Sequence, residues 1–442
     1  MFRLPSDREL ADQDLLNFIQ KHNSEVAFRY QPLRDAYMTD YPIFRMPEKP
    51  KYKPDNRIAV NFAKYITDTM NGFFIGNPIK ITSTDKDVEK YVNLLDQYND
   101  QDDNNAELSK MCSIYGHAYE MYFVDEEGHI GITYVSPMEA FMIYDDSVLE
   151  RERYFVRLYL DADNVLHGSV SDEERVRYFT QKGEIVWSKE KKPHGFDGVP
   201  ATKYVDNAEE VGIFEPSMTM INAYNKAISE KANDVDYYAD AYLKILGAKV
   251  QDDNLSNIRD NRIINFDGEA ARDMIVDFLQ KPNGDTTQEN LIDRLERLIF
   301  QISMVANISD ESFGASSGIA LKYKLQAMSN LEKTKERKFI SGMNRRYRLI
   351  FSNTVSGMKQ DAWLTLKYQF SPNFPANLLE ESQIAGNLAG ISSQKTRLKV
   401  LSVVDDVNEE IERIKEEQGA IGYDADYPTN RIAEIGEQGV EN

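Results

Sequence analysis

Serine hydroxyls and carboxylates lie together in residues 308–320, ISDESFGASSGIA, and such side chains can attack carbonyls, bind metals or repel anions. The segment has four serines and two glycines, and it shows no apolar periodicity. This composition predicts a flexible loop rather than a helix or a strand. Nothing in the sequence around it is arranged as a nucleophile with a base and an oxyanion hole. The loop therefore offers hydroxyl groups and negative charge without catalytic machinery.

The motifs of common catalytic and metal sites are missing from the sequence. There is no GxxxxGK[ST] phosphate loop, so an ATP-driven motor is not expected, and there is no CxxC or HExxH motif. The acidic run DQYNDQDDNN lacks the ligand spacing of a calcium loop, which favours a capped loop between two helices. We therefore predict a protein that is not an enzyme and needs no cofactor. A nuclease that uses its acidic clusters is the enzymatic alternative.

Two predicted helices position the serine-rich loop. The first, residues 286–307, carries an apolar stripe with 4-3-4-3 spacing, formed by Leu291, Leu295, Leu298, Ile302 and Val305. The second begins at Leu321 and is long, with its inward positions predicted at Leu321, Leu325, Met328, Leu331 and Phe339. An exposed loop of small residues at the start of a long helix suggests that something passes or docks there.

The charge of the chain is strongly negative but unevenly distributed. A formal net charge of −21 argues against tight or sequence-reading DNA binding, because such affinity depends on neutralising phosphates. Residues 322–348 nevertheless hold nine basic side chains and only two acidic ones. In the simpler interpretation these basic residues form a solvated helix face or pair with acidic neighbours. In the functional interpretation they contact nucleic acid or an acidic partner subunit.

The single cysteine and the composition limit the class of protein. With 442 residues, 41% hydrophobic and 28% charged, the chain is long enough for two to four compact units. Cys112 excludes an intramolecular disulfide, and its apolar neighbours predict a buried, inert thiol suited to a reducing cytoplasm. We expect neither secretion nor membrane insertion, because no signal peptide or apolar span is visible.

The order of the remaining elements predicts an α+β chain. A helix (Asp7 to Arg29) and a Pro- and Tyr-rich arm come first, then a helix from Val60 to Phe73 and two helices within residues 85–118. Period-two patterns from Tyr119 to Ser188 predict an antiparallel meander. A helix from Glu215 to about Leu246 precedes a short insert, residues 247–285, with strand-like RIINF and VDFLQ but too little apolar sequence for a core of its own. The strand-like WLTLKYQF, three helical segments and an acidic tail complete the chain.

The order of five stretches resembles the portal proteins of tailed double-stranded DNA phages, particularly siphophages of Gram-positive hosts. The stretches are NRIAVNFAKYITDTMNGFFIGNPIKI, YGHAYEMYF with VSPMEAFMIYDD, GIFEPSMTMINAYNKAISEKANDVDYYADAYLKILG, SGIALKYKLQAMSNLEKTKERKF, and GISSQKTRLKVLSVVDDVNEEIERIKEE. Each is weak alone, but together they extend from about Asn56 to Glu417 in the expected order.

The resemblance implies a ring, usually of twelve subunits, around a central channel. Carried onto this chain, it implies a wing (1–213, with the strand return 351–372), two stem helices (214–246 and 286–307), a clip (247–285), a tunnel loop (308–320), a long helix (321–350), a helical crown (373–418) and a mobile acidic tail (419–442). The clip's lack of a core fits this picture, because neighbouring clips would pack together around the ring.

The family's function would be packaging, retention and ejection of DNA at the capsid vertex of the virion, and attachment of head to tail. The implied partners are further copies of the chain, the double-stranded DNA, the terminase motor, a head–tail adaptor, and the major capsid and scaffolding proteins, with assembly in the bacterial cytoplasm. The channel-facing residues would be Ser309, Asp310, Glu311, Ser312, Phe313, Gly314, Ser316 and Ser317, with Lys322 and Lys324 as possible contacts to the DNA backbone. Another head–tail or capsid-associated protein without a channel is the structural alternative.

Overall fold

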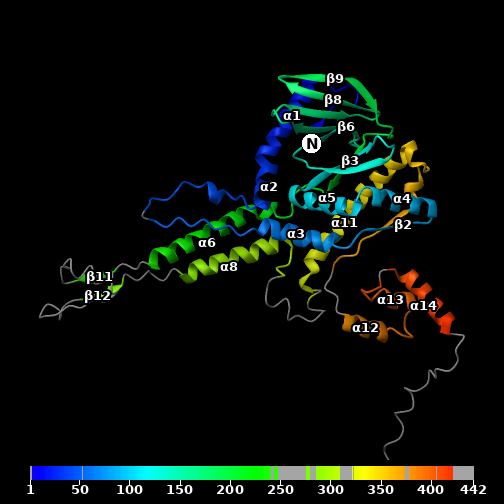
Figure 1. Cartoon of the computed structure of the whole chain (residues 1–442). Coiled ribbons are helices and arrows are strands. Elements are labelled where there is room, and N and C mark those ends of the chain that lie inside the picture. The colour runs from blue at the N-terminus through cyan, green and yellow to red at the C-terminus, as the bar shows by residue number, and fades with distance from the viewer. Residues whose placement is uncertain are drawn as a thin grey trace, which may run out of the picture. The chain divides into compact units, whose positions relative to one another are not determined.

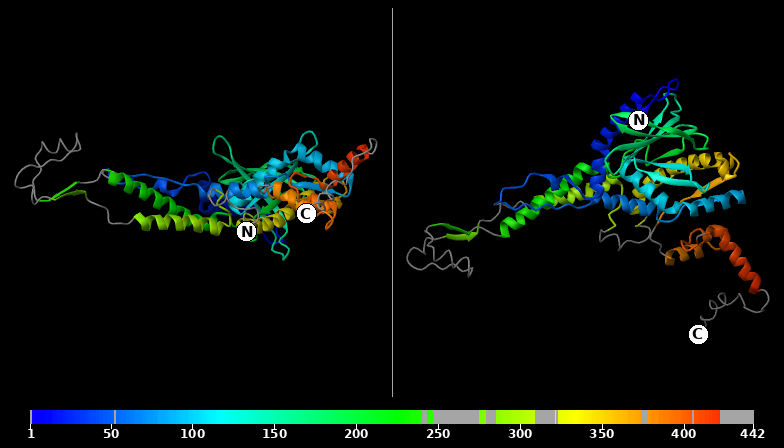
Figure 2. Two further views of the ribbon diagram at one scale, coloured as in Figure 1. Left: turned by 90° about the horizontal axis from the view of Figure 1, so that it is seen from below. Right: turned by 45° about the horizontal axis from the view of Figure 1, so that its top comes forward.

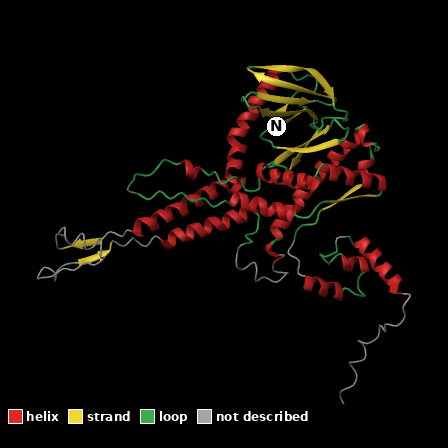
Figure 3. Cartoon of the chain, in the orientation of Figure 1, coloured by secondary structure: helices red, strands yellow, loops and turns green. Residues whose placement is uncertain are grey.

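The computed structural model describes residues 2–51, 53–239, 243–246, 275–278, 285–308, 321, 323–373, 378–404 and 406–421. Its elements mix helices and strands, so the predicted α+β class is confirmed (Figure 3). Contacts divide the chain into two units: Met1–Phe313 with Tyr323–Asn373, and Gly314–Lys322 with Phe374–Asn442. Each unit is described here by itself.

A six-stranded sheet forms one end of the first unit (Figure 1). In spatial order its strands are β1 (Phe2–Arg3), β5 (Ala140–Tyr144), β6 (Glu152–Leu160), β7 (Leu166–Ser171), β8 (Arg175–Lys182) and β9 (Glu184–Pro193). All neighbours are antiparallel except β1, which pairs parallel with β5. Because side chains alternate along a strand, Phe141 and Ile143 pack in the cluster that includes Leu15 and Ile19 of helix α1 (Asp12–Glu25).

The opposite face of β5 meets a second sheet. Ala140, Met142 and Tyr144 cluster with Tyr119 and other residues of a three-stranded sheet, β10 (Ala201–Val205), β3 (His117–Val124) and β4 (Ile130–Val135). The predicted single meander is therefore wrong. Strands β3 and β4 pair with the later β10, and β5–β9 form a sheet that the N-terminal β1 completes.

Helices α3 (Phe62–Ile75), α4 (Lys86–Tyr98), α5 (Gln101–Tyr115) and α11 (Gln326–Ser352) lie beside the second sheet (Figure 1). Two of these helices have side-chain caps: Asn61 and Asp85 accept backbone N–H groups at the starts of α3 and α4. Gly116 ends α5 with φ of 85°, and a Cβ there would lie 1.9 Å from the carbonyl oxygen of Glu210. The strand expected in WLTLKYQF is β13 (Leu366–Gln369), which pairs with β2 (Lys80–Ser83).

The N-terminal helix starts later than predicted. Residues before Asp12 are not helical, and a π-helical turn (Val26–Tyr30) joins α1 to α2 (Gln31–Tyr37). After a 3-10 turn (Pro42–Arg45), the described residues 46–51 and 53–61 have no regular structure, as the prolines predict. This segment runs beside helix α6 (Met218–Ala239) in every view (Figures 1 and 2).

Helices α6 and α8 (Asp285–Ser303) form a long pair (Figures 1 and 2). The helix predicted to reach Leu246 was wrong at its end, because α6 stops at Ala239 and Leu243–Leu246 is a strand, β11. Strand β11 pairs antiparallel with β12 (Ile275–Phe278), which lies in the strand-like VDFLQ; RIINF lies outside the described residues.

In the second unit the described residues 378–404 and 406–421 form three helices, α12 (Leu378–Asn387), α13 (Gln394–Leu398) and α14 (Val407–Ile421). Ser393 caps α13 by accepting the N–H of Thr396, and Asp406 accepts the N–H groups of Asn408 and Glu409 at the start of α14. Among the side chains described in these helices and their connections, none is buried. The helices predicted in this region are confirmed; the tail beyond Ile421 lies outside the described residues.

Candidate functional site

The N-terminal base of the serine-rich loop is anchored on helix α3. Helix α8 ends at Ser303, and Met304 follows with φ of 58°. Val305 is 2% exposed, and the backbone N–H of Ile308 donates to the Tyr65 hydroxyl over 2.9 Å. The predicted loop residues themselves, Ser309, Asp310, Glu311, Ser312, Phe313, Gly314, Ser316 and Ser317, all lie outside the described residues.

The C-terminal base of the loop is held by the start of the long helix. Leu325 and Met328 are 3% and 2% exposed, as predicted for inward positions, whereas Tyr323 and Lys324 are exposed. Lys322 lies outside the described residues. Phe339, also predicted to face inward, is 1% exposed and contacts Phe74 of α3 edge to face at 5.7 Å. Both bases of the loop therefore rest on elements that pack against α3.

Arg346, one of the nine basic residues, is a buried partner of Glu120. The guanidinium donates to both carboxylate oxygens of Glu120 at 2.7 and 2.8 Å, and to Asn105 Oδ1 at 2.7 Å. The side chains of Arg346 and Glu120 are 0% and 1% exposed. The hydroxyls of Tyr122 and Tyr204 and the amide of Gln101 also donate to Glu120. This pair holds α11 against β3.

A second buried pair lies on the same face of α11, about three turns before Arg346. The Lys335 ammonium is 2.7 Å from Asp206 Oδ1 and donates to the carbonyl of Ser109 and the hydroxyl of Ser113. Cys112 is buried between these groups, and burial raises the pKa of its thiol, so the predicted inert cysteine is confirmed. Arg345 also pairs, with Glu152 at 3.1 Å. Lys333 pairs with Glu336 of its own helix at 2.7 Å. Pairing with acidic neighbours thus accounts for at least four of the nine basic residues.

The carboxyl of Asp96 lies beside the Arg346–Glu120 pair, and its titration predicts how stability depends on pH. Burial raises the pKa of its carboxyl from 3.8 to about 6, and the Tyr347 hydroxyl donates to it over 3.4 Å. Between pH 3.8 and about 6 the Asp96 carboxyl is protonated in the folded chain but ionised in the unfolded chain. The contribution of protonated Asp96 to the free energy of unfolding is therefore complete below pH 3.8 and is lost as pH rises through about 6.

We expect Asp96→Asn to raise the free energy of unfolding at pH 8 by about 1–3 kcal/mol relative to the unaltered chain, and to change it little near pH 4. Urea unfolding at the two pH values measures this difference. Asp103→Asn, at an exposed position of the neighbouring helix α5, is the control. Equal effects of Asp96→Asn at both pH values would show that the Asp96 carboxyl is not perturbed.

Helix α8 has a buried apolar face beside the predicted stripe, and of the stripe residues only Val305, just beyond the helix, is fully buried. Ile292 and Ile299 are 6% and 0% exposed, whereas Leu291 and Ile302 are 51% and 44% exposed. Leu295 and Leu298 are half-buried. At 100° per residue the buried positions lie about 100° around the helix from the stripe. In the single chain Leu291 and Ile302 are therefore exposed at the two ends of this stripe, and Leu295 and Leu298 between them are half-buried.

Helix α6 carries a polar stripe that the sequence analysis missed. Asn225, Ser229 and Asn233 are buried at four-residue spacing, and their oxygens accept the N–H groups of Val60, Ile58 and Asn56 at 2.8, 2.9 and 2.6 Å. The sequence feature that could have revealed this stripe is the spacing of four residues between these small polar side chains, which places them on one face of the helix beside Ile221 and Tyr224. We call these three residues the ladder, and residues 42–60 the arm.

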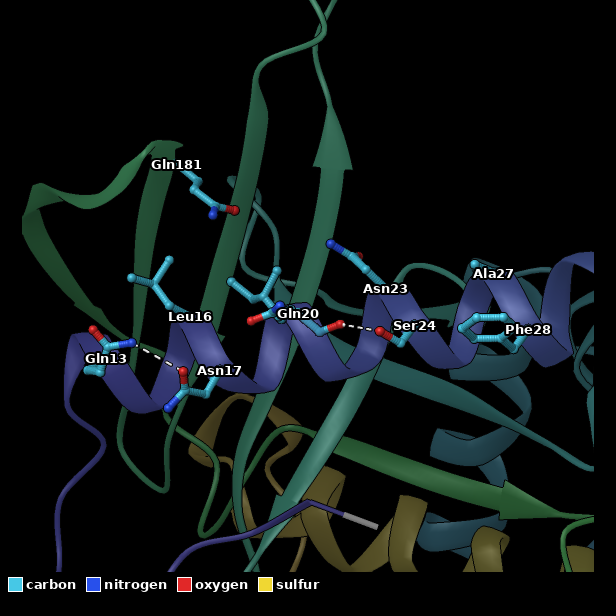
Figure 4. A pocket seen from close by; sticks show the side chains of 10 residues that line it. Gln13, Leu16, Asn17, Gln20, Asn23, Ser24, Ala27, Phe28 and Gln181 are labelled. Carbon is cyan, nitrogen blue, oxygen red and sulfur yellow. Dashed lines mark hydrogen bonds between the residues drawn. The ribbon is translucent and has the colours of Figure 1, made fainter.

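Figure 4 shows a groove along α1, with a volume of about 510 Å³. Its lining is formed mainly by amide side chains, with Gln181 contributed by β8 and the exposed Phe28 at one end. A smaller cavity of about 210 Å³ adjoins His22 and His117, whose pKa values burial lowers. Among the described residues no group of three or more His, Cys, Asp or Glu could hold a metal ion. Neither cavity contains a recognisable catalytic set.

Comparisons with known proteins bear on the site. The sequence profile of the family described as "Phage portal protein, SPP1 Gp6-like" matches residues 16–422. The portal protein of Bacillus phage SPP1 is 24% identical over 396 residues, which cover 83% of this chain and 76% of that protein. The portal protein of Clostridium phage phiCD119 is 22% identical over 396 residues, which cover 82% of this chain and 85% of that protein. No described helix meets the length and hydropathy needed to span a membrane.

Proposed function

Because the chain belongs to the SPP1 Gp6-like family of phage portal proteins, we propose that twelve copies of it form a ring whose channel conducts DNA into and out of the capsid. A portal protein is a structural component of the virion and not an enzyme. The single observation that carries the ring is the apolar stripe of α8, which the chain leaves partly exposed at Leu291 and Ile302 although the other apolar face of the helix is buried. Exposed stripes of this kind mark protein–protein interfaces.

In this proposal the parts of the chain have separate tasks. The two sheets with α3–α5, residues 1–213, and the return strand in 351–372 form the wing. Residues 214–246 and 286–307 form the stem, 247–285 the clip, 308–320 the tunnel loop and 321–350 the long helix, while 373–418 form the crown and 419–442 the tail. The pairing of α6 with α8, and of β11 with β12 beyond them, supports a stem that leads to a clip.

The proposed clip meets the terminase motor and then the head–tail adaptor, and the wing and crown meet the capsid and scaffolding proteins. These partners locate the ring at the capsid vertex. The absence of a core among the described side chains of the crown helices supports a unit that packs against other chains rather than alone.

The tunnel loop would let DNA slide without holding it. Its hydroxyls and carboxylates, without Lys or Arg, would not bind phosphates, and Lys322 and Lys324 behind it would contact the DNA backbone only weakly. The two anchored bases, at Ile308 and Leu325, support a loop that can change without disturbing the fold.

Deleting residues 310–317 is therefore expected to leave ring assembly intact and to lower the DNA retained in particles several-fold. Assembly is measured by native mass, and retained DNA by nuclease protection of filled heads. Loss of assembly in the deletion variant would mean that the loop is a structural element.

The ring itself is tested by the mass of the purified full chain, alone and after co-assembly with capsid and scaffolding proteins. Mass photometry over a range of concentrations should detect a single closed oligomer. A chain that stays monomeric under both conditions would rule the proposal out. A closed oligomer without a central opening would instead favour a capsid-associated protein that has no channel.

A further inference from the structure

Helix α6 lies between the arm and α8, so the chain has two distinct flanks. The ladder residues Asn225, Ser229 and Asn233 face the arm. Lys231 and Asp234, which pair with Glu289 and Gln288 of α8, lie on the roughly opposite side of the helix at 100° per residue. Figures 1 and 2 agree on this order of arm, α6 and α8.

The ladder fixes the arm on α6 through the arm's backbone. Two extended residues advance about 6.6 Å and four helical residues about 6 Å, so alternate N–H groups of the arm meet successive turns of α6. The hydroxyl of Ser229 also donates to the carbonyl of Ile58 over 3.0 Å. Pro54, two residues before Asn56, has no N–H. It could not donate to the ladder if the arm slid by two residues along α6.

Hydrogen bonds of Asn61 join the two ends of the arm. The Asn61 amide donates to the Tyr37 carbonyl over 2.9 Å and to the Thr39 hydroxyl over 2.6 Å, and the Tyr41 hydroxyl donates to Asn61 over 3.2 Å. Lys49 adds an ion pair with Glu230 of α6 at 2.6 Å. The arm is therefore a rigid outer edge of the α6–α8 pair.

This edge presents apolar side chains to solvent. Phe44, Met46 and Ile58 are 42%, 45% and 40% exposed. The Arg57 guanidinium donates to the Phe44 carbonyl over 3.0 Å and so joins the outgoing and returning segments of the arm. We call Phe44, Met46 and Ile58 the arm patch. Leu291 and Ile302 of the α8 stripe are also exposed, and α8 lies across α6 from the arm (Figures 1 and 2).

We infer that the arm patch of one copy packs against the α8 stripe of the next copy, so that the arm forms part of the joint between neighbours. The inference rests on the proposed ring. A ring needs two different, complementary surfaces on each subunit, and these two surfaces are both apolar and belong to elements that lie on either side of α6. A preorganised arm also loses little conformational entropy when the neighbour binds.

The positions of the arm patch and the α8 stripe along the α6–α8 pair indicate which residues of neighbouring copies should face each other. The contacts Gln288–Asp234, at 3.1 Å, and Lys231–Glu289 bring the start of α8 level with the later turns of α6. Because the two helices run in opposite directions, Leu291 lies close to the level of Ser229, and Ser229 binds Ile58. Ile58 of one copy is therefore expected opposite Leu291 of the next.

Cysteine crosslinking in the full chain tests this pair. Ile58→Cys and Leu291→Cys are made singly and together, each at an exposed side chain, while the buried Cys112 stays as it is. Oxidation of assembled rings of the double variant should convert monomer to a series of covalent multimers on a denaturing gel. Neither single variant should form them. The triple change Asn225→Ala, Ser229→Ala, Asn233→Ala, added to the double variant, should lower the crosslinking yield because it frees the arm.

The outcomes separate this inference from the proposed function. Intact rings without crosslinks in the double variant would overturn the arm–α8 joint and leave the ring standing. Crosslinking in Ile58→Cys alone would also overturn it, because like surfaces would then meet. Failure of the unaltered chain to form rings, alone or with capsid and scaffolding proteins, would overturn both.

Discussion

Replacing Arg346 with methionine is expected to lower the free energy of unfolding by about 3–5 kcal/mol, because the change leaves the Glu120 carboxylate buried without its counter-charge. Glu120 is 1% exposed, and it keeps only neutral donors, from Gln101, Tyr122 and Tyr204. These donors cannot replace a guanidinium that contacts both oxygens. Urea unfolding of the full chain followed by circular dichroism measures the loss.

Two controls make the Arg346 experiment specific. Arg348→Met removes the same charge from an exposed position two residues away and should change stability by no more than about 0.5 kcal/mol. Arg346→Met combined with Glu120→Leu removes both charges and should recover part of the loss. An Arg346→Met variant as stable as the Arg348→Met control would contradict the buried pair.

The second large effect is expected at the α8 stripe. Leu291→Asp with Ile302→Asp should raise the concentration needed for assembly at least ~100-fold, because burying an unpaired carboxylate at an apolar joint costs several kcal/mol. Both residues are exposed in the single chain, so the fold should be unaffected. Native mass spectrometry over a dilution series measures assembly.

Arg294→Ser with Arg297→Ser is the matched control for the stripe. It changes the net charge by the same amount, at two exposed positions of α8 outside the stripe. The control should assemble like the unaltered chain. Equal loss of assembly in both variants would mean that charge alone governs association and that the stripe is not a joint.

The sequence predicted helices where the apolar period was long and the caps were clear. Asn61, Ser393 and Asp406 cap helices that were expected from their patterns. Pairing between distant strands was not predictable, because alternation identifies a strand but not its neighbour. Strand β1 pairs with β5 across more than a hundred residues, and β10 returns to β3, so one predicted meander became parts of two sheets.

The faces of the stem helices were harder to predict than the helices themselves. In α8 the more regular leucine stripe is the less buried of the two faces, because a surface for a second chain has the same apolar period as a surface for the core. In α6 the arm is bound by Asn and Ser, residue types whose pattern the hydrophobic analysis does not record. Likewise, a run of basic residues does not reveal that Lys335 and Arg346 have buried partners.

An image of the assembled protein along its symmetry axis tests the central claim most directly. Electron microscopy of the full chain, co-assembled with capsid and scaffolding proteins if needed, should show a ring of identical subunits around an open centre. The α6–α8 pairs should stand side by side around that opening. Particles that are monomeric, or rings with a closed centre, would contradict a conduit for DNA.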